Sequence, residues 1–298
     1  MARRVTRGSS AHLAVLGAAL LFSTGGAAIK ATTLDAWQVA GFRSGIATVA
    51  FLICFPAARR RWTGRTLLVG VAYGATLLCY VIANKLTTAA NSIFLQSTGP
   101  LYIAMLAPWL LREHIRRRDV GFMLVLAIGL SLFFLTETPM QTSAPNPRAG
   151  NLAAAVSGLG WAFTVMGLRW VGREAHGGDT ALAATTIGNV LVFACCLPLT
   201  LGSSLGGPLD LLVVTYLGLF QLALAYVLLT SGIHHVPAVE ASLLLLLEPA
   251  LNPVWTWLAH GERPGPWAML GGAIILAATT VKAGLDSRAL RSADRPRR

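Results

Sequence analysis

Apolar positions follow one another in long blocks along the chain, and short segments with glycine, proline or charge separate the blocks. A helix needs about 20 apolar residues to cross the hydrocarbon layer of a membrane. Blocks such as 211–229 are apolar on every side, unlike the alternating strands of a transmembrane barrel. The pattern therefore predicts an all-α integral membrane protein with ten transmembrane helices, at residues 11–30, 36–58, 66–84, 90–111, 119–136, 150–171, 180–201, 211–232, 238–259 and 266–284.

The composition agrees with this prediction. The 298 residues are 55% hydrophobic and only 12% charged, and the mean hydropathy is +0.63, whereas about a quarter of the residues of a soluble domain are charged. The four cysteines all fall inside predicted spans, where they act as small hydrophobic residues. Neither a disulfide framework, nor a metal site, nor a cofactor is predicted.

The net charge of +12 is distributed unevenly across the predicted membrane. With a cytoplasmic N-terminus, nineteen lysines and arginines lie on the cytoplasmic side and four on the other, while Arg43 lies inside a span. The positive-inside rule then predicts that both termini lie in the cytoplasm. The expected location of the protein is a bacterial-type plasma (inner) membrane. The basic clusters are short and border the spans. We expect them to contact anionic lipid headgroups rather than nucleic acid.

A polar, proline-rich connection at 136–148 divides the predicted spans into five and five. The two units are residues 1–140 and 141–298. Because each unit crosses the membrane an odd number of times, the second must enter from the opposite side. Two inverted five-helix repeats are therefore predicted, an arrangement that recurs in secondary transporters.

Matching positions in the two halves support the repeat. Each half carries a proline followed thirteen residues later by a glutamate, and an aromatic residue followed eight residues later by a base. The matched pairs are Pro100 with Pro249, Glu113 with Glu262, Phe22 with Trp161 and Lys30 with Arg169.

These features carry a resemblance over nearly the whole chain. The sequence resembles the drug/metabolite transporter superfamily in its ten-helix form, with two EamA-type repeats. The resemblance rests on the segment from Pro100 to Glu113 with glycines after it, on its echo from Pro249 to Glu262, and on the start of the second half up to Trp161. It implies a carrier for small organic solutes, often an exporter of amino acids, other metabolites or drugs.

Glu248 is the foremost candidate for a functional residue, because an ionisable group in hydrocarbon is costly and faces protein or water. It lies ten residues into the ninth predicted span, which is about 15 Å deep at 1.5 Å per residue. It could bind a substrate ammonium group, exchange a proton, or pair structurally with a tyrosine or glutamine. Arg43, in the second span, could likewise hold a carboxylate or a structural partner.

Pro100 and Pro249 are predicted to kink two equivalent helices, because proline removes a backbone donor and frees a carbonyl four residues earlier. Such interruptions at the middle of the membrane are where secondary transporters bind their cargo. Lys30 and Lys85, at span ends, are expected to snorkel to the interface, and Glu113 and Glu262 to anchor gates. The remaining predicted substrate-binding residues are Phe22, Ser23, Tyr80, Gln96, Thr98, Trp161, Gln221 and Tyr226. Ser97 is a further candidate at the same depth of the membrane.

The function predicted from these observations is secondary transport by alternating access, either facilitated or proton-coupled. The cargo is a small organic solute, with export of amino acids or related metabolites as the main hypothesis and a multidrug or organic-cation exporter as the alternative. The expected partners are the solute, membrane lipids and, if transport is coupled, protons. An intramembrane enzyme is not favoured, because the sequence lacks a G-x-S-x-G elbow, an H-E-x-x-H motif and a P-loop.

Overall fold

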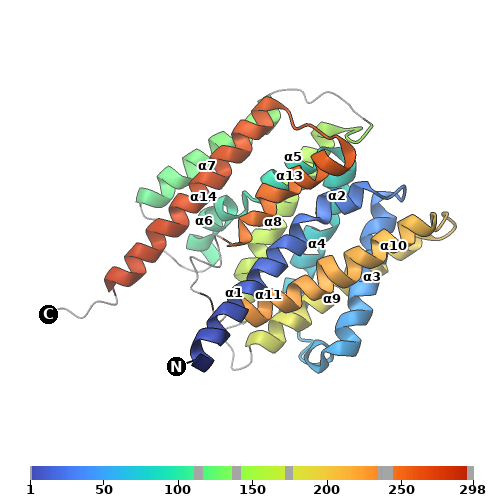
Figure 1. The fold of residues 1–298 in the computed structure, drawn as a ribbon, viewed down its shortest axis with the longest axis horizontal. Helices are drawn as coiled ribbons and strands as arrows, with labels where there is room; N and C mark the ends of the chain where they lie inside the picture. The colour runs from blue at the N-terminus through green and yellow to red at the C-terminus, as the bar shows by residue number, and fades with distance from the viewer. Residues whose placement is uncertain are drawn as a thin grey trace.

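The computed structural model describes residues 2–110, 117–135, 142–171, 177–233, 236 and 244–293, which form a bundle of helices (Figure 1). The helices of the first half are α1 (Ala2–Ser23), α2 (Gly25–Lys30), α3 (Ala36–Cys54), η1 (Pro56–Arg59), α4 (Gly64–Leu86), α5 (Ala89–Gln96), α6 (Gly99–Leu110) and α7 (Arg117–Leu135). Those of the second half are α8 (Pro147–Val171), α9 (Gly177–Thr200), α10 (Pro208–Tyr216), the π-helix η2 (Leu217–Leu224), α11 (Ala225–Ile233), α13 (Leu247–His260) and α14 (Pro266–Ala293).

Six helical segments in the described part of the chain are long and apolar enough to cross a membrane, and two shorter apolar helices accompany them. The six are Ser10–Lys30, Ala36–Cys54, Gly64–Leu86, Pro147–Leu168, Thr180–Thr200 and Pro208–Gly232, and the shorter two are Val120–Phe134 and Pro266–Lys282. The prediction of an all-helical membrane protein is confirmed at this level. The count of ten spans stays a prediction.

Local sequence sets where several helices begin and end. Asp35 and Gln38 form a capping box, in which each side chain accepts a hydrogen bond from the other's backbone N–H, so α3 begins at Ala36. The same helix ends at Cys54, four residues before the predicted end of the span at 58, because Pro56 disfavours helical backbone in the residue before it. Gly261, with a φ of 65°, ends α13 in the left-handed conformation that glycine adopts readily.

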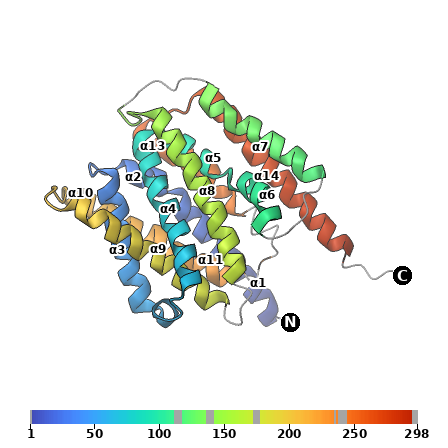
Figure 2. The same ribbon diagram turned by 180° about the vertical axis from the view of Figure 1, so that it is seen from behind.

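Glycines allow the central helices to approach closely. A Cβ atom on Gly41 would lie 2.8 Å from Cys196, and one on Gly70 would lie 2.7 Å from Ile187, so α3 and α4 both pack tightly on α9. α4 also packs along α8. Figures 1 and 2 show α7 and α14 side by side at one edge of the bundle, where Gly129 approaches the carbonyl oxygen of Gly271.

In the described part of the chain, four predicted spans contain an interruption of the α-helix, and one of these is a turn at Leu246 in the ninth span. A turn at Thr24 separates α1 from α2, and a turn at Ser97 and Thr98 separates α5 from α6. In the eighth span the helix widens to a π-helix between α10 and α11. Interrupted helices leave backbone groups unpaired, which a membrane protein tolerates only inside the protein or beside a cavity.

Candidate functional site

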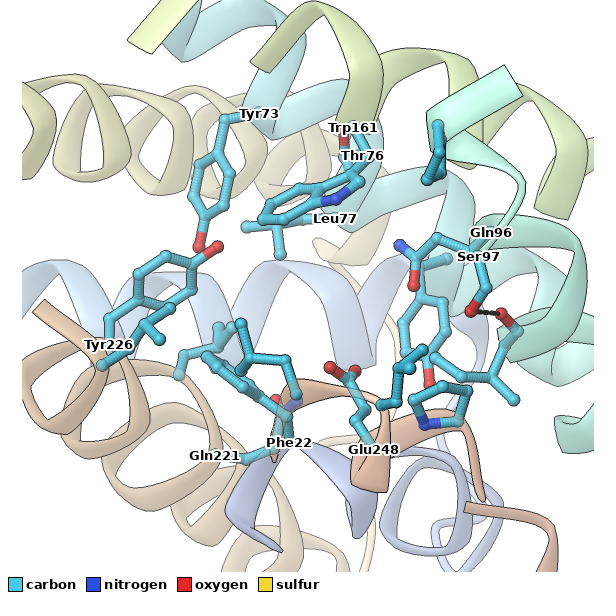
Figure 3. Close-up of a pocket in the computed structure, with 18 of the residues that line it drawn as sticks. Phe22, Tyr73, Thr76, Leu77, Gln96, Ser97, Trp161, Gln221, Tyr226 and Glu248 are labelled. Atoms are coloured by element: carbon cyan, nitrogen blue, oxygen red, sulfur yellow. Dashed lines mark hydrogen bonds between the residues drawn. The ribbon is translucent and has the colours of Figure 1, made fainter. Parts of the chain in front are cut away.

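A cavity of about 350 Å³ lies between helices of both halves of the chain (Figure 3). Its volume is in the range of pockets that take small organic molecules. The helix interruptions at Thr24 and Ser97, and η2, lie beside it. Its wall consists of Phe22, Arg43, Tyr73, Thr76, Leu77, Tyr80, Ile93, Gln96, Ser97, Pro100, Trp161, Gln221, Leu222, Tyr226, Leu229, Leu245, Leu246, Glu248, Pro249 and Thr279.

The structure brings most of the predicted site residues together at this cavity. Those that line it are Phe22, Arg43, Tyr80, Gln96, Ser97, Pro100, Trp161, Gln221, Tyr226, Glu248 and Pro249. Ser23 and Thr98 are not among the lining residues. The hydroxyl of Ser23 accepts from the indole of Trp255 at 2.9 Å, and that of Thr98 donates to the carbonyl of Leu95 at 2.6 Å. That the lining residues bind substrate stays a prediction.

Sequence reasoning missed several lining residues. Tyr73, Thr76 and Leu77 lie one to two turns before Tyr80 on the same helix, α4. Residues three, four and seven apart share a helix face, so this spacing from Tyr80 is the signal that could have found them. The other missed residues are mostly aliphatic and carry no such signal: Ile93, Leu222, Leu229, Leu245, Leu246 and Thr279.

Glu248 lies in the first turn of α13 and points its carboxylate into the cavity (Figure 3). Within the described part of the chain, no hydrogen bond or ion pair occupies this carboxylate. The N-terminal position supplies the positive end of the helix dipole, which stabilises a negative charge. Pro249 follows in the same turn, where proline is tolerated. The interruption therefore falls before Pro249, at the turn of Leu246.

Arg43 reaches the cavity from α3 and is 1% exposed. Its Nη2 donates to the carbonyl of Leu77 at 3.1 Å, while its Nε and Nη1 have no hydrogen-bond partner in the described structure. A buried guanidinium with free donors is costly. Arg43 therefore retains the capacity to bind an anionic group.

A series of hydrogen bonds between polar groups holds Gln96, the last residue of α5, in place on one side of the cavity. Gln96 donates from Nε2 to the hydroxyl of Ser157 at 2.9 Å, and Ser157 donates to the carbonyl of Thr76 at 3.0 Å. These bonds join α5, α8 and α4. Because Ser157 is fully buried, the position of the Gln96 amide is set by the surrounding protein.

Aromatic rings form the side of the cavity opposite Gln96. The rings of Tyr73 and Tyr226 meet edge to face with centroids 5.5 Å apart, and Phe22 meets Tyr226 in the same way at 5.3 Å. The hydroxyl groups of the two tyrosines point toward one another in Figure 3. Gln221, on η2, carries a buried Oε1 without a partner in the described structure. π-helical turns are frequent at functional sites, and no sequence pattern predicts this one.

Beyond the cavity, Lys30 contradicts the expectation that it snorkels to the interface. Its Nζ lies 2.9 Å from Oε2 of Glu262, and the two side chains are 5% and 1% exposed. Lys85 is also engaged, since its Nζ donates to the carbonyl of Thr32 at 2.8 Å. Glu113, the predicted counterpart of Glu262, lies outside the described residues.

A helical membrane protein with an apolar and aromatic cavity that carries a few polar groups, as here, has the architecture of a small-molecule transporter. The model of the EamA-like transporter family matches residues 9–135 and again residues 148–282. The chain therefore belongs to the EamA-like transporter family. This confirms the resemblance drawn from the sequence, and the prediction that the chain is a transporter and not an enzyme.

Individual relatives point the same way. The chain is 27% identical to the threonine/homoserine exporter RhtA of Escherichia coli (strain K12) over 248 residues, which cover 80% of this chain and 79% of RhtA. It is 30% identical over 168 residues to the uncharacterized transporter YetK of Bacillus subtilis (strain 168), and this match spans 54% of this chain and about half, 49%, of YetK. A solved crystal structure shares the fold, with a TM-score of 0.62 and 20% identity over 94% of this chain and 99% of its own.

Proposed function

We propose that this protein is a secondary transporter that exports amino acids or related small metabolites by alternating access, and that the cavity around Glu248 and Arg43 is its substrate site. The observation that carries the proposal is that both ionisable side chains line one cavity, and that neither is paired with an opposite charge in the described structure. A solute with both an ammonium and a carboxylate group would satisfy both. Similarity to a threonine/homoserine exporter is consistent with such a cargo.

The proposed architecture is ten transmembrane helices in an inner membrane, arranged as two inverted repeats at residues 1–140 and 141–298. Both termini lie on the cytoplasmic side. The two separate family matches support this division. Helix packing supports it as well, because equivalent contacts recur. In the two proposed repeats, α1 is equivalent to α8 and α4 is equivalent to α11. α4 packs on α8, and in the same way α11 packs on α1. The equivalent pairs α3 with α9 and α7 with α14 pack on each other.

Alternating access is supported by the interruptions at the cavity. α5 and α13 are short helices that end or begin at the cavity wall, at Gln96 and Glu248. Short helices of this kind can tilt at the interruption while their own hydrogen bonds stay intact. Exchange of a proton at Glu248 would couple such a movement to a pH gradient.

The test is uptake into proteoliposomes of the purified protein, across labelled amino acids, nucleosides and organic cations, with and without a pH gradient. We expect flux of one or more zwitterionic amino acids. Glu248→Gln keeps the size of the side chain and removes its charge, and we expect flux to fall about tenfold or more, the effect of losing one charged hydrogen bond. Flux of organic cations alone would favour the alternative cargo. Absence of flux for every class contradicts the proposal.

A further inference from the structure

A buried ion pair ties three helices together at the end of the molecule away from the chain termini (Figure 1). Lys30 is the last residue of α2, and Glu262 follows the end of α13 by two residues. Their charged groups are 2.9 Å apart. The second carboxylate oxygen of Glu262 accepts a hydrogen bond at 2.6 Å from the backbone N–H of Ala89, the first residue of α5. We call Lys30, Glu262 and the Ala89 N–H the latch.

The lysine of the latch also contacts the backbone. Besides the carboxylate, its ammonium group donates to the carbonyl of Thr87 at 2.9 Å and to that of Ser143. An ammonium group has three N–H donors. Two of them have carbonyl acceptors, whereas Oε2 of Glu262 lies within ion-pair distance but accepts no hydrogen bond in the described structure. A buried ion pair is stable only when such additional bonds compensate for the water that both charges lose. The latch is therefore a specific contact in which Lys30 is held by backbone carbonyls, while Oε2 of Glu262 is held by the attraction between the two charges.

Each helix held by the latch has its other end at the cavity. α2 begins just after Phe22, α5 ends with Gln96, and α13 begins next to Glu248, and these three side chains line the cavity. At 1.5 Å per residue, the eight residues of α5 span about 12 Å and the fourteen of α13 about 21 Å. The backbone hydrogen bonds of each helix couple its two ends. A movement at the cavity wall is therefore transmitted to the latch.

We propose that the latch is the closed gate between the cavity and the non-cytoplasmic face, and that Lys30 and Glu262 separate whenever solute passes on that side. The proposal rests on the transport function and orientation proposed above. Net stabilisation by a buried ion pair is small, because solvation of the separated charges offsets most of their attraction. Such a pair keeps a gate closed. Once water reaches both charges, the pair separates with only a small cost in free energy.

Accessibility of the cavity tests the gate without any knowledge of the cargo. In a protein whose four native cysteines are replaced, Ser97→Cys places a single thiol on the cavity wall. A membrane-impermeant maleimide is applied to the non-cytoplasmic side of intact spheroplasts, and the rate of labelling is measured. Glu262→Gln keeps the acceptor for Ala89 and removes the charge. We expect it to raise the labelling rate about tenfold, as loss of a charged hydrogen bond would.

Lys85→Gln is the matched control, because Lys85 lies at the same end and its ammonium group bonds the carbonyl and hydroxyl oxygens of Thr32 rather than an acid. We expect its labelling rate to equal that of the parent. Lys30→Gln should match Glu262→Gln. Glu262→Asp, which keeps the charge but retracts it by one methylene, should give an intermediate rate and covers the case in which the neutral variants do not fold.

The proposal is overturned if labelling stays at the parent rate in the folded Glu262 and Lys30 variants, or rises equally in Lys85→Gln. Cooperative thermal unfolding of each purified variant establishes that it is folded. Because labelling needs no solute, a failed gate and a failed transport function are told apart. In the first case cargo flux is present and labelling does not respond, and in the second labelling responds and no solute moves.

Discussion

Asn252 donates a hydrogen bond from its side-chain Nδ2 to the hydroxyl of Tyr80 at 3.1 Å, and thereby joins α13 to α4 next to the cavity. Both side chains are buried, with exposed fractions of 0% and 6%. Asn252 lies one helical turn from Glu248, and Tyr80 lines the cavity. The bond therefore fixes the helix that carries the proposed substrate carboxylate against the other half of the chain.

Removal of the hydroxyl in Tyr80→Phe should destabilise the protein, because it leaves the buried amide of Asn252 without its acceptor. An orphaned buried donor costs about 1–3 kcal/mol, so we expect a lower midpoint of thermal unfolding in detergent. Tyr216→Phe is the control. The hydroxyl of Tyr216 bonds Thr24, which keeps a second bond to the carbonyl of Leu21. Equal losses in the two variants would contradict the role given to the Asn252 bond.

Ser157→Ala should weaken substrate binding without slowing the transport cycle, because Ser157 holds Gln96 in position but does not line the cavity. We expect KM to rise about three- to tenfold, the effect of one neutral hydrogen bond, with little change in the maximal rate. Ser92→Ala removes a buried hydroxyl that bonds only a carbonyl of its own helix, that of Thr88. It should leave KM unchanged. A purely structural role for Ser157 would instead lower the amount of active protein at constant KM.

Arg43→Gln should abolish the preference for solutes that carry a carboxylate. The variant removes the two unpartnered donors at Nε and Nη1, and a charged hydrogen bond corresponds to roughly a ten- to hundredfold change in affinity. Competition of amino acids and of the corresponding amines against labelled cargo measures the effect. Arg43→Lys retains the charge and should keep part of the preference. An unaltered preference in Arg43→Gln would assign Arg43 a structural role only.

Gly188→Ala should force α4 and α9 apart. The added Cβ would lie 2.6 Å from a ring carbon of Tyr73 and 2.7 Å from the carbonyl oxygen of Gly70, and neither distance is sterically possible. Overpacking of this kind costs about 1–3 kcal/mol, which a thermal melt of the purified variant would detect. Gly121→Ala adds the same atom where nothing lies within 4 Å. It should leave stability unchanged or slightly raised, because alanine is the better helix former.

Much of the candidate site was predictable because intramembrane polar residues are rare and costly. Glu248, Arg43 and Gln96 stand out in apolar segments for that reason alone, and all three line the cavity. Ser23 was predicted for the same reason and lies off the cavity wall, because its hydroxyl faces Trp255. Helical spacing indicates on which face of a helix a side chain lies. It does not indicate which other helix packs against that face.

Lys30 is the clearest case of what sequence reasoning could not reach. Near the end of an apolar segment, a lysine that snorkels and a lysine that is buried in an ion pair give the same pattern. The choice depends on whether an acid from another segment comes within reach, and Glu262 is 232 positions away along the chain. The π-helix around Gln221 is a similar case, since a change of the backbone hydrogen bonds to the i→i+5 pattern leaves no mark on a uniformly apolar segment.

The sequence by itself determined that this protein is a helical membrane protein, which family it resembles and which polar residues stand inside its apolar segments, because hydropathy and the expense of buried charge act locally on each segment. The tertiary structure decided which of those residues share a cavity, where the helices break, and that Lys30 meets Glu262. Those outcomes depend on contacts between segments far apart in the chain. No local pattern encodes them, since each partner satisfies its own hydrogen bonds only once the helices have packed.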